Sequence, residues 1–388
     1  MNIVYIGAFR LPDLDAAAPR VLNNAKAFRA LGHNVRFISW GGTYRENHYC
    51  DDGKYRVQGF EYQISGDLPL DDSLKERFRS KLFRGKRSIR ILNKLPKPNL
   101  IIIYNANNSF SKYMIKYCRR NNIKLANDIN EWFSNNELHI MELLPNYINM
   151  TRTQYKIKNK IVISSFLDKY YSTSNNVLIP PLCDSDDSKW TDTIEDNRIK
   201  PYEGITLIYA GTPAKKDCLH PIVSAVNSLA NEGLPIRFLI LGTTRETYMK
   251  QYECFSHFLH QNIIFLGRVA QDLIPAYYKK ADYMVLLREP SRKSMAGFPT
   301  KFSESFMSGV PVITNATSDL AKYVITGKTG FIVDGWDCDS LLRTLQEKVL
   351  VLKRNEIDYM KSCVIESRKY FDWHYYISDF KAFIQNLK

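Results

Sequence analysis

The chain has 388 residues, of which 45% are hydrophobic and 24% are charged, with a net charge of +14. This composition excludes a disordered chain, and the length favours two domains with separate cores. The seven cysteines are scattered and form no CxxC pair, which argues against a disulfide framework or a zinc site.

The first residues, NIVYIGAF, follow no basic leader and predict a strand rather than a signal peptide. No apolar run approaches the roughly 18 residues that a membrane span needs. We therefore expect a cytoplasmic protein made in a reducing compartment.

In the first half of the chain, short apolar runs alternate with helical patterns. Gly32 stands where a helix C-terminal cap belongs. The predicted strands are 2–9, 33–40, 99–106, 123–129, 160–166 and 175–181, with helices over 19–32 and 110–121. Such alternation predicts a parallel sheet covered by helices on both faces.

Much of the positive charge lies within 75–97, which holds ten Lys/Arg against one Glu. Leu74, Phe78 and Leu82 recur at four-residue spacing, so this stretch has the pattern of a basic amphipathic helix. Three interpretations stay open: contact with an anionic membrane surface, a solvated helix beside an anionic ligand, and nucleic-acid binding. We rank nucleic acid last, because aromatic residues are not interleaved for base stacking.

An acidic stretch then interrupts the alternation. Residues 184–196 carry six acids and one Lys, and we expect 184–203 to be a linker. The alternation restarts with predicted strands at 205–211, 236–242, 263–269, 281–289, 310–313 and 329–334, and with helices near 217–232 and 271–280. The sequence thus predicts two doubly wound α/β domains, 1–183 and 204–370, which face a ligand-binding cleft.

The loop after the first strand of the second half, YAGTPAKKD (209–217), suggests an anion site. Gly211 and Thr212 follow the strand, Lys216 adds a cation, and Asp217 could cap the next helix. Free backbone N–H groups at a helix start, together with an ammonium group, suit a phosphate. The alternative is a basic strand–helix turn without a ligand. Arg268 ends a strand in the same way.

The stretch AGFPTKFSESFMSGVPVI (296–313) combines backbone-special residues with one acid. Gly297, Phe298 and Pro299 form a loop in which glycine allows close approach to a ligand and proline suits the first helical turn. Thr300 and Lys301 begin the helix. Glu304, one turn further on, can accept hydrogen bonds from the two hydroxyls of a ribose.

These residues resemble those of the retaining family 4 glycosyltransferases, which have the GT-B architecture. The family motif is E-G-F-G-x-x-x-x-E followed by A-x-x-x-G-x-P-V-I, so Glu304 matches the second glutamate, which holds the nucleotide ribose. The first glutamate is replaced by Ala296, which leaves recognition of the donor sugar open. Lys216 and Arg268 match the cations that meet the donor phosphates and base, with the base near Gly242.

The first half is similar to the same family, most clearly in NDINEWF (127–133). By this resemblance Arg20, Asn105, Asp128 and Glu131 are candidates for the acceptor or sugar side. The tail 371–388 resembles the last helix of GT-B proteins, which packs back on the N-terminal domain.

The resemblance implies a retaining transferase that moves a sugar from a nucleotide-diphosphate-sugar to a glycan or polyprenyl-diphosphate-linked acceptor in bacterial surface polysaccharide synthesis. The first domain would bind the acceptor and the second the donor, without a cofactor or metal and without nucleic acid. A location at the inner face of the cell membrane is implied as well. Two alternatives remain, a nucleotide-sugar epimerase and a non-catalytic nucleotide-sugar-binding protein.

Overall fold

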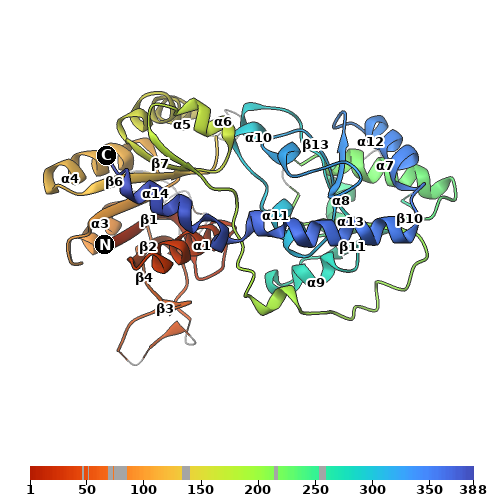
Figure 1. Ribbon diagram of the computed structural model, residues 1–388, viewed down its shortest axis with the longest axis horizontal. Helices are drawn as coiled ribbons and strands as arrows, with labels where there is room; N and C mark the ends of the chain where they lie inside the picture. Colours follow the sequence, from red (N-terminus) through yellow and green to blue (C-terminus); the bar gives the residue numbers. More distant parts are fainter. Residues whose placement is uncertain are drawn as a thin grey trace. The chain divides into compact units, whose positions relative to one another are not determined.

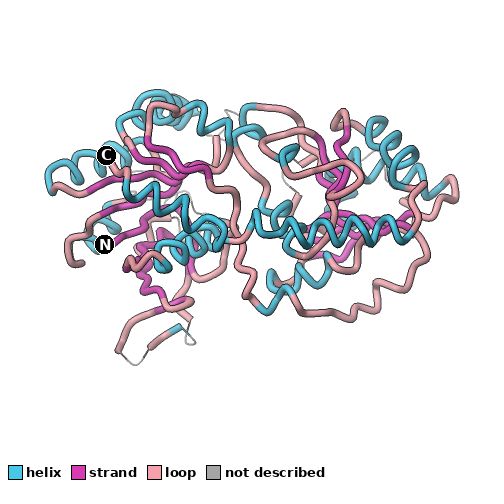
Figure 2. Tube along the Cα trace, viewed as in Figure 1, coloured by secondary structure: helices cyan, strands magenta, loops and turns pink. Residues whose placement is uncertain are grey.

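The computed structural model divides the chain into two compact units (Figures 1 and 2). Unit 1 consists of Met1–Cys183 and Trp373–Lys388, and unit 2 of Asp184–Asp372. The structure describes residues 1–45, 48–50, 52–68, 73, 85–132, 140–213, 217–252 and 259–388. Among these residues, no helix has the length and apolarity that crossing a bilayer would require.

Unit 1 is built on an eight-stranded sheet in the order β3-β4-β2-β1-β5-β6-β7-β8. Its strands are β1 (Asn2–Leu11), β2 (Asn34–Gly42), β3 (Arg56–Val57), β4 (Phe60–Ile64), β5 (Leu100–Tyr104), β6 (Lys124–Ile129), β7 (Asn159–Val162) and β8 (Asn175–Leu178). All neighbours are parallel except β3 and β4. The central strand β5, LIIIY, is buried along its whole length, as expected for a parallel strand covered on both faces.

Helices cover both faces of this sheet. They are α1 (Ala17–Ala30), α3 (Lys86–Leu92), α4 (Asn108–Asn121), α5 (Ile140–Ile148), α6 (Ser165–Tyr170) and α14 (Ile377–Gln385). On one face α1 and α14 share a core, in which the rings of Phe28 and Phe380 lie 4.7 Å apart. On the other face α3 and α4 pack over residues such as Ile101 and Ile103. The last 16 residues, 373–388, therefore belong to the core of unit 1.

Unit 2 has a six-stranded, fully parallel sheet in the order β11-β10-β9-β12-β13-β14. Its strands are β9 (Ile205–Ala210), β10 (Ile236–Leu241), β11 (Ile263–Gly267), β12 (Tyr283–Leu286), β13 (Val312–Asn315) and β14 (Gly330–Val333). Its helices are α7 (Leu219–Asn231), α8 (Arg245–Gln251), α9 (Ile274–Tyr278), α10 (Arg292–Ala296), α11 (Thr300–Met307), α12 (Cys338–Thr344) and α13 (Arg354–Ser367). The predicted α/β class with two parallel sheets is confirmed.

The acidic stretch 184–203 lies within unit 2. It forms a short helical turn, η5 (Ser188–Trp190), whose Trp190 is buried. Asp196 accepts a hydrogen bond from the Tyr277 hydroxyl at 2.9 Å, and Arg198 donates to the Leu266 carbonyl oxygen at 2.9 Å. These contacts hold the stretch against unit 2.

Part of the basic stretch 75–97 lies outside the described residues, because the structure describes it only from residue 85 onward. The described part contains α3, but Leu74, Phe78 and Leu82, which define the predicted amphipathic pattern, lie outside the described residues, so that prediction is not tested. The Gly85 N-cap of α3 has a positive φ of 89°, and Asp67 accepts hydrogen bonds from the backbone N–H and hydroxyl of Ser88.

Candidate functional site

The carboxyl ends of β9, β10 and β11 meet at one edge of the unit 2 sheet, where each strand is followed by or ends in glycine. The Gly211 N–H donates to the Leu241 oxygen at 3.3 Å, and the Gly242 N–H to the Gly267 oxygen at 2.7 Å. A Cβ on Gly242, whose φ is +94°, would lie 2.4 Å from the Gly211 carbonyl carbon. The two loops therefore approach each other more closely than a side chain allows.

Lys301 reaches this edge from the first turn of α11. Its Nζ donates to Asp217 Oδ2 at 2.6 Å and to the Tyr209 hydroxyl at 2.9 Å. A Cβ on Gly211 would lie 2.5 Å from Lys301 Cε, so the Gly211 loop also lies against this side chain. Pro299 is the N-cap of α11, and no side chain caps the helix there. The N-terminus of α11 and the Lys301 ammonium thus come from the same turn, and a helix N-terminus suits an anion.

Asp217 holds two cations in place. Besides Lys301 it accepts a hydrogen bond from Arg288 Nε at 3.1 Å, and both Asp217 and Arg288 are buried. Burial alone would raise the pKa of the Asp217 carboxyl, but Lys301 and Arg288 outweigh it and lower the pKa to about 2. The carboxylate therefore stays charged and fixes both cations.

The expectation that Asp217 caps the following helix was wrong. Helix α7 begins after Cys218, and its N-cap makes no side-chain hydrogen bond. The carboxylate instead binds Arg288, which follows β12, Lys301 of α11 and the Tyr209 hydroxyl of β9. Sequence reasoning missed Arg288 and Tyr209. The signal for Arg288 was available, since it lies near the carboxyl end of the predicted strand 281–289.

Lys216, predicted to meet the donor phosphates, lies outside the described residues, as do Ala214 and Lys215. Its role stays a prediction. Thr212 and Arg268 are described, and both are exposed after β9 and β11. Among the described residues, neither side chain has a hydrogen-bond partner, so both are free to meet a ligand.

Glu304 lies in the second turn of α11 with its side chain half-buried. No described residue donates a hydrogen bond to its carboxylate. Burial raises the pKa of Glu304 to about 7, although the positive charges of Lys189 and Lys301 act in the opposite direction. A crowded carboxylate without a donor is unusual in a folded protein, and a ligand with hydroxyl groups would supply what it lacks.

The loop Gly297–Pro299 contributes backbone rather than side chains. Phe298 is buried, and its ring lies 5.7 Å from that of Phe302 and 5.9 Å from that of Phe371. Gly297 has an extended φ of −91° that any residue adopts. Ala296 is fully buried at the end of α10. The structure thus brings together the loop, Thr300, Lys301, Gly211 and Gly242 on unit 2.

In unit 1, two predicted residues form a buried ion pair. Arg20 Nη2 lies 2.8 Å from Asp128 Oδ1, with side chains 3% and 0% exposed. Asp128 also accepts hydrogen bonds from the Tyr5 hydroxyl at 2.5 Å and from Asn24 at 3.2 Å. Burial and the neighbouring Asp128 charge raise the pKa of Tyr5 well above its usual value, so the phenol stays a donor. Neither side chain of the pair is exposed, so any effect on an acceptor would pass through their neighbours.

The other two predicted residues lie at nearby strand ends. Asn105, half-buried with a positive φ of 43°, follows β5, and its backbone N–H donates to the backbone carbonyl oxygen of Asp128 at 3.3 Å. Glu131 follows β6 and is half-buried. These two are therefore better placed to meet a ligand than Arg20 and Asp128.

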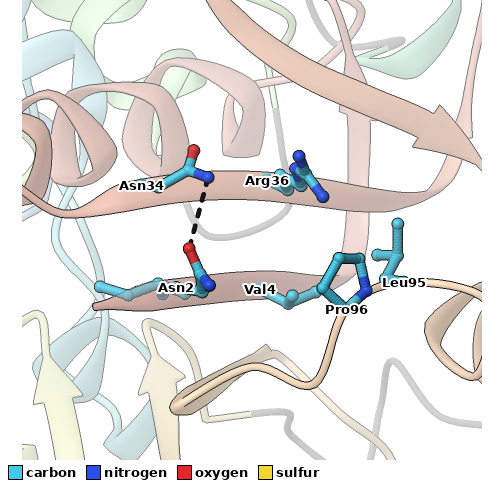
Figure 3. A pocket seen from close by; sticks show the side chains of 7 residues that line it. Asn2, Val4, Asn34, Arg36, Leu95 and Pro96 are labelled. Atoms are coloured by element: carbon cyan, nitrogen blue, oxygen red, sulfur yellow. Dashed lines mark hydrogen bonds between the residues drawn. The ribbon is translucent and has the colours of Figure 1, made fainter.

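A cavity of about 210 Å³ lies elsewhere in unit 1, at the amino ends of β1 and β2. Figure 3 shows Asn2 and Asn34 joined by a hydrogen bond, with Arg36 further along the same strand as Asn34 and with Leu95 and Pro96 on the side of Val4. Ligands of parallel α/β sheets bind at the opposite, carboxyl ends. This cavity is therefore not part of the candidate site.

Comparison with known proteins finds a family match within the second unit. The model of the family described as glycosyl transferases group 1 matches residues 204–349, which hold the whole six-stranded sheet and α11. The matched residues make up 146 of the 388 residues of the chain, and they are similar to that family over this stretch. This stretch carries the glycine-lined edge, Lys301 and Glu304.

One curated relative is similar in sequence over part of the chain. A glycosyltransferase of Salmonella typhimurium named for colanic acid biosynthesis, WcaL, is 25% identical over 171 residues. The match spans 42% of this chain and 40% of that relative.

The fold of the whole chain is similar to that of sucrose-phosphate synthase from Thermosynechococcus elongatus, with a TM-score of 0.72, 15% identity, and coverage of 99% of this chain and 98% of that one. Anabaena Alr3699/HepE, solved with UDP-glucose, gives a TM-score of 0.70 at 12% identity and covers 100% of both chains. The GT-B fold class is thus confirmed.

Proposed function

We propose that the protein is a retaining glycosyltransferase that moves a hexosyl or related sugar from a nucleotide-diphosphate-sugar to a glycan or lipid-linked acceptor. The observation that carries this proposal is the position of the family match. It falls on the part of unit 2 where strand-end glycines, the Lys301 ammonium and the unpartnered Glu304 carboxylate occur on connected elements.

Each part of the site suits one part of the donor. The Glu304 carboxylate would accept hydrogen bonds from the ribose hydroxyls, and the base would lie near Gly242 and Arg268. The diphosphate would lie over the Gly297–Lys301 turn, with Lys216 adding a cation. The similar Anabaena protein was solved in complex with UDP-glucose, which supports a nucleotide-sugar as the ligand class.

The chemistry requires stabilisation of a leaving group. When the bond between the sugar and the diphosphate breaks, negative charge grows on the departing oxygen. Lys301 is already held by Asp217, and the N–H groups of α11 have no side-chain cap, so neither must reorganise as this charge appears. Fixed donors and cations of this kind are usually a large contribution to catalysis.

Retention would follow if the acceptor attacked from the face that the diphosphate leaves, and we propose that no metal takes part. Acceptor binding is assigned to unit 1, with Asn105 and Glu131 as its better-exposed candidates. The colanic acid name of the Salmonella relative supports a role in surface polysaccharide synthesis, which would place the enzyme in the cytoplasm at the inner membrane face.

A thermal-shift screen with UDP-, GDP-, ADP- and dTDP-sugars tests donor binding, since a bound donor stabilises by mass action. Lys301→Met should abolish the donor-induced shift, and Lys328→Met, at an exposed lysine of the same unit, should keep it. An equal shift in both variants would refute the assignment of Lys301.

Turnover separates the proposal from its alternatives. We expect nucleotide release to depend on the acceptor and the product to keep the anomeric configuration of the donor. We also expect EDTA to leave the activity unchanged. An isomerised free sugar would indicate an epimerase. Donor binding without turnover would indicate the binding protein that the buried Ala296 favours.

A further inference from the structure

One surface of unit 1 carries an excess of positive charge that the donor site does not use. Residues 85–127 contain ten Lys/Arg and no Asp or Glu. Helices α3 and α4 of this region cover the same face of the sheet (Figure 1). They are joined by a hydrogen bond of 3.1 Å from the Tyr117 hydroxyl to Asn93 Oδ1.

Helix α4 has a buried apolar side and an exposed basic side. Phe110, Met114 and Cys118, spaced four apart, face the sheet. Exposed cations occupy the opposite side of α4 and continue onto α3 and the turn after it. We call this surface the basic face, and its members are Arg90, Lys94, Lys112, Lys116, Arg119 and Arg120.

None of these six cations forms an ion pair with a described residue. The helix dipole favours Arg119 and Arg120 in the last turn of α4, but it gives no such benefit to Lys112 near the start. Lys112 and Lys116, and Lys116 and Arg120, stand four residues apart, where like charges repel. Stability of unit 1 alone therefore does not explain the arrangement, and an external anion would.

The geometry points to a bilayer surface that contains anionic lipid, and we propose that the basic face docks there. The charges spread over two adjacent helices rather than lining a pocket, which suits a broad array of headgroups. Tyr113 is 43% exposed among these cations, and tyrosine is favoured at membrane–water interfaces. Its ring stacks on that of Tyr117 at 6.1 Å, which leaves less ring surface for the base stacking of a nucleic acid.

This proposal extends the proposed function, which gives unit 1 a lipid-linked acceptor. It also moves the membrane contact expected within 75–97 onto α4 and the described end of that stretch. Vesicle binding does not depend on turnover, so the two proposals can fail separately.

Flotation of the full chain with vesicles tests the docking. The protein should float with vesicles of 30% phosphatidylglycerol in phosphatidylcholine at low salt, and the bound fraction should fall at least tenfold in pure phosphatidylcholine or at high salt. The α4 variant carries Lys112→Gln, Lys116→Gln, Arg119→Gln and Arg120→Gln. It should lose at least tenfold in binding and keep the donor-induced thermal shift of the wild type.

A matched control removes four exposed cations of unit 2 through Lys280→Gln, Lys328→Gln, Arg343→Gln and Lys348→Gln. Its net charge equals that of the α4 variant, and its binding should stay within twofold of wild type. Equal loss in both variants would show that total charge alone decides binding, and the proposal would fail.

Two further outcomes would also overturn it. Flotation that survives in the α4 variant but is lost on neutralising Lys75, Arg77, Arg79 and Lys81 would place the contact in that segment. The second outcome is a wild type that binds a DNA duplex and no vesicles. If the α4 variant then lost the DNA binding, the partner would be a nucleic acid.

Discussion

Glu304 is held in an environment that does not favour its charge. Its carboxyl has an ordinary pKa of 4.5 in an unfolded chain and about 7 in the folded protein. Between these values the unfolded state has released a proton that the folded state keeps. The contribution of Glu304 to the free energy of unfolding is therefore fully present below about pH 4.5, and it is lost as the pH rises through 7.

Glu304→Gln removes this penalty, because the amide has no charge to bury. We expect the variant to be about 1–3 kcal/mol more stable than wild type at pH 8, and less than about 1 kcal/mol more stable at pH 5. Urea unfolding at the two pH values measures the difference. The same variant should lose donor affinity at pH 8, where wild type presents a carboxylate to the ribose.

A stability gain that is equal at both pH values would show that packing, rather than ionisation, separates the two proteins. Wild-type donor affinity in the variant would remove Glu304 from the site. We expect the variant to gain stability and to lose donor binding, because a residue kept for function can destabilise the fold.

At the scale of elements, the strand-end loops depend on glycine for two separable reasons. Gly242 has a positive φ, and its missing side chain admits the Gly211–Thr212 backbone within 2.6 Å of the Cβ position. Gly233, after α7, has a similar φ of +80°, but nothing lies within 4 Å of its Cβ position. A comparison of alanine variants at Gly242 and Gly233 therefore separates the cost of a positive φ from the cost of a close contact with the neighbouring loop.

Gly233→Ala should cost about 1–2 kcal/mol, the strain of a left-handed alanine. Gly242→Ala should cost about 1–3 kcal/mol more, because the two loops must also move apart. Chemical denaturation gives both values, and donor-induced thermal shifts should fall only in the Gly242 variant. Equal costs and equal donor shifts would mean that the loops tolerate separation and that their contact does not shape the site.

The sequence predicts elements better than it predicts contacts between them. Alternating apolar runs located the strands other than β3 and β4, since parallel strands buried on both faces appear as continuous hydrophobic segments. Helix α11 begins at Thr300, one residue after the Pro299 expected in its first turn. The partners of Asp217 could not be predicted, because Arg288 and Lys301 lie 71 and 84 residues away in the chain. The sheet order places β12 beside β9 and so brings Arg288 next to Asp217, while Lys301 reaches Asp217 from α11.

At the scale of the whole molecule, each unit has its own sheet, and the last helix, α14, is part of unit 1. Tyr376, Phe380 and Phe383 enter the core under α1. Damage to α14 should therefore affect the stability of unit 1, and donor binding should report on unit 2.

Phe380→Ala should destabilise unit 1 by about 3–5 kcal/mol, the usual cost of removing a fully buried phenylalanine. Calorimetry with and without donor measures this effect. We expect a lower first transition in the variant and an unchanged donor-induced shift. Phe380→Leu serves as the conservative control, with a smaller loss. If Phe380→Ala abolished donor binding, the two units would not be energetically separate.

The split of unit 1 around unit 2 has a consequence for synthesis. A ribosome adds roughly 5–20 residues per second, so residues 184–372 take about 10–40 seconds to make. Throughout that interval unit 1 exposes the apolar surface around Phe28 that α14 later covers. A nascent chain thus presents a binding site for chaperones until its last residues emerge. Chains cut short near residue 373 would keep that site and become substrates for proteolysis.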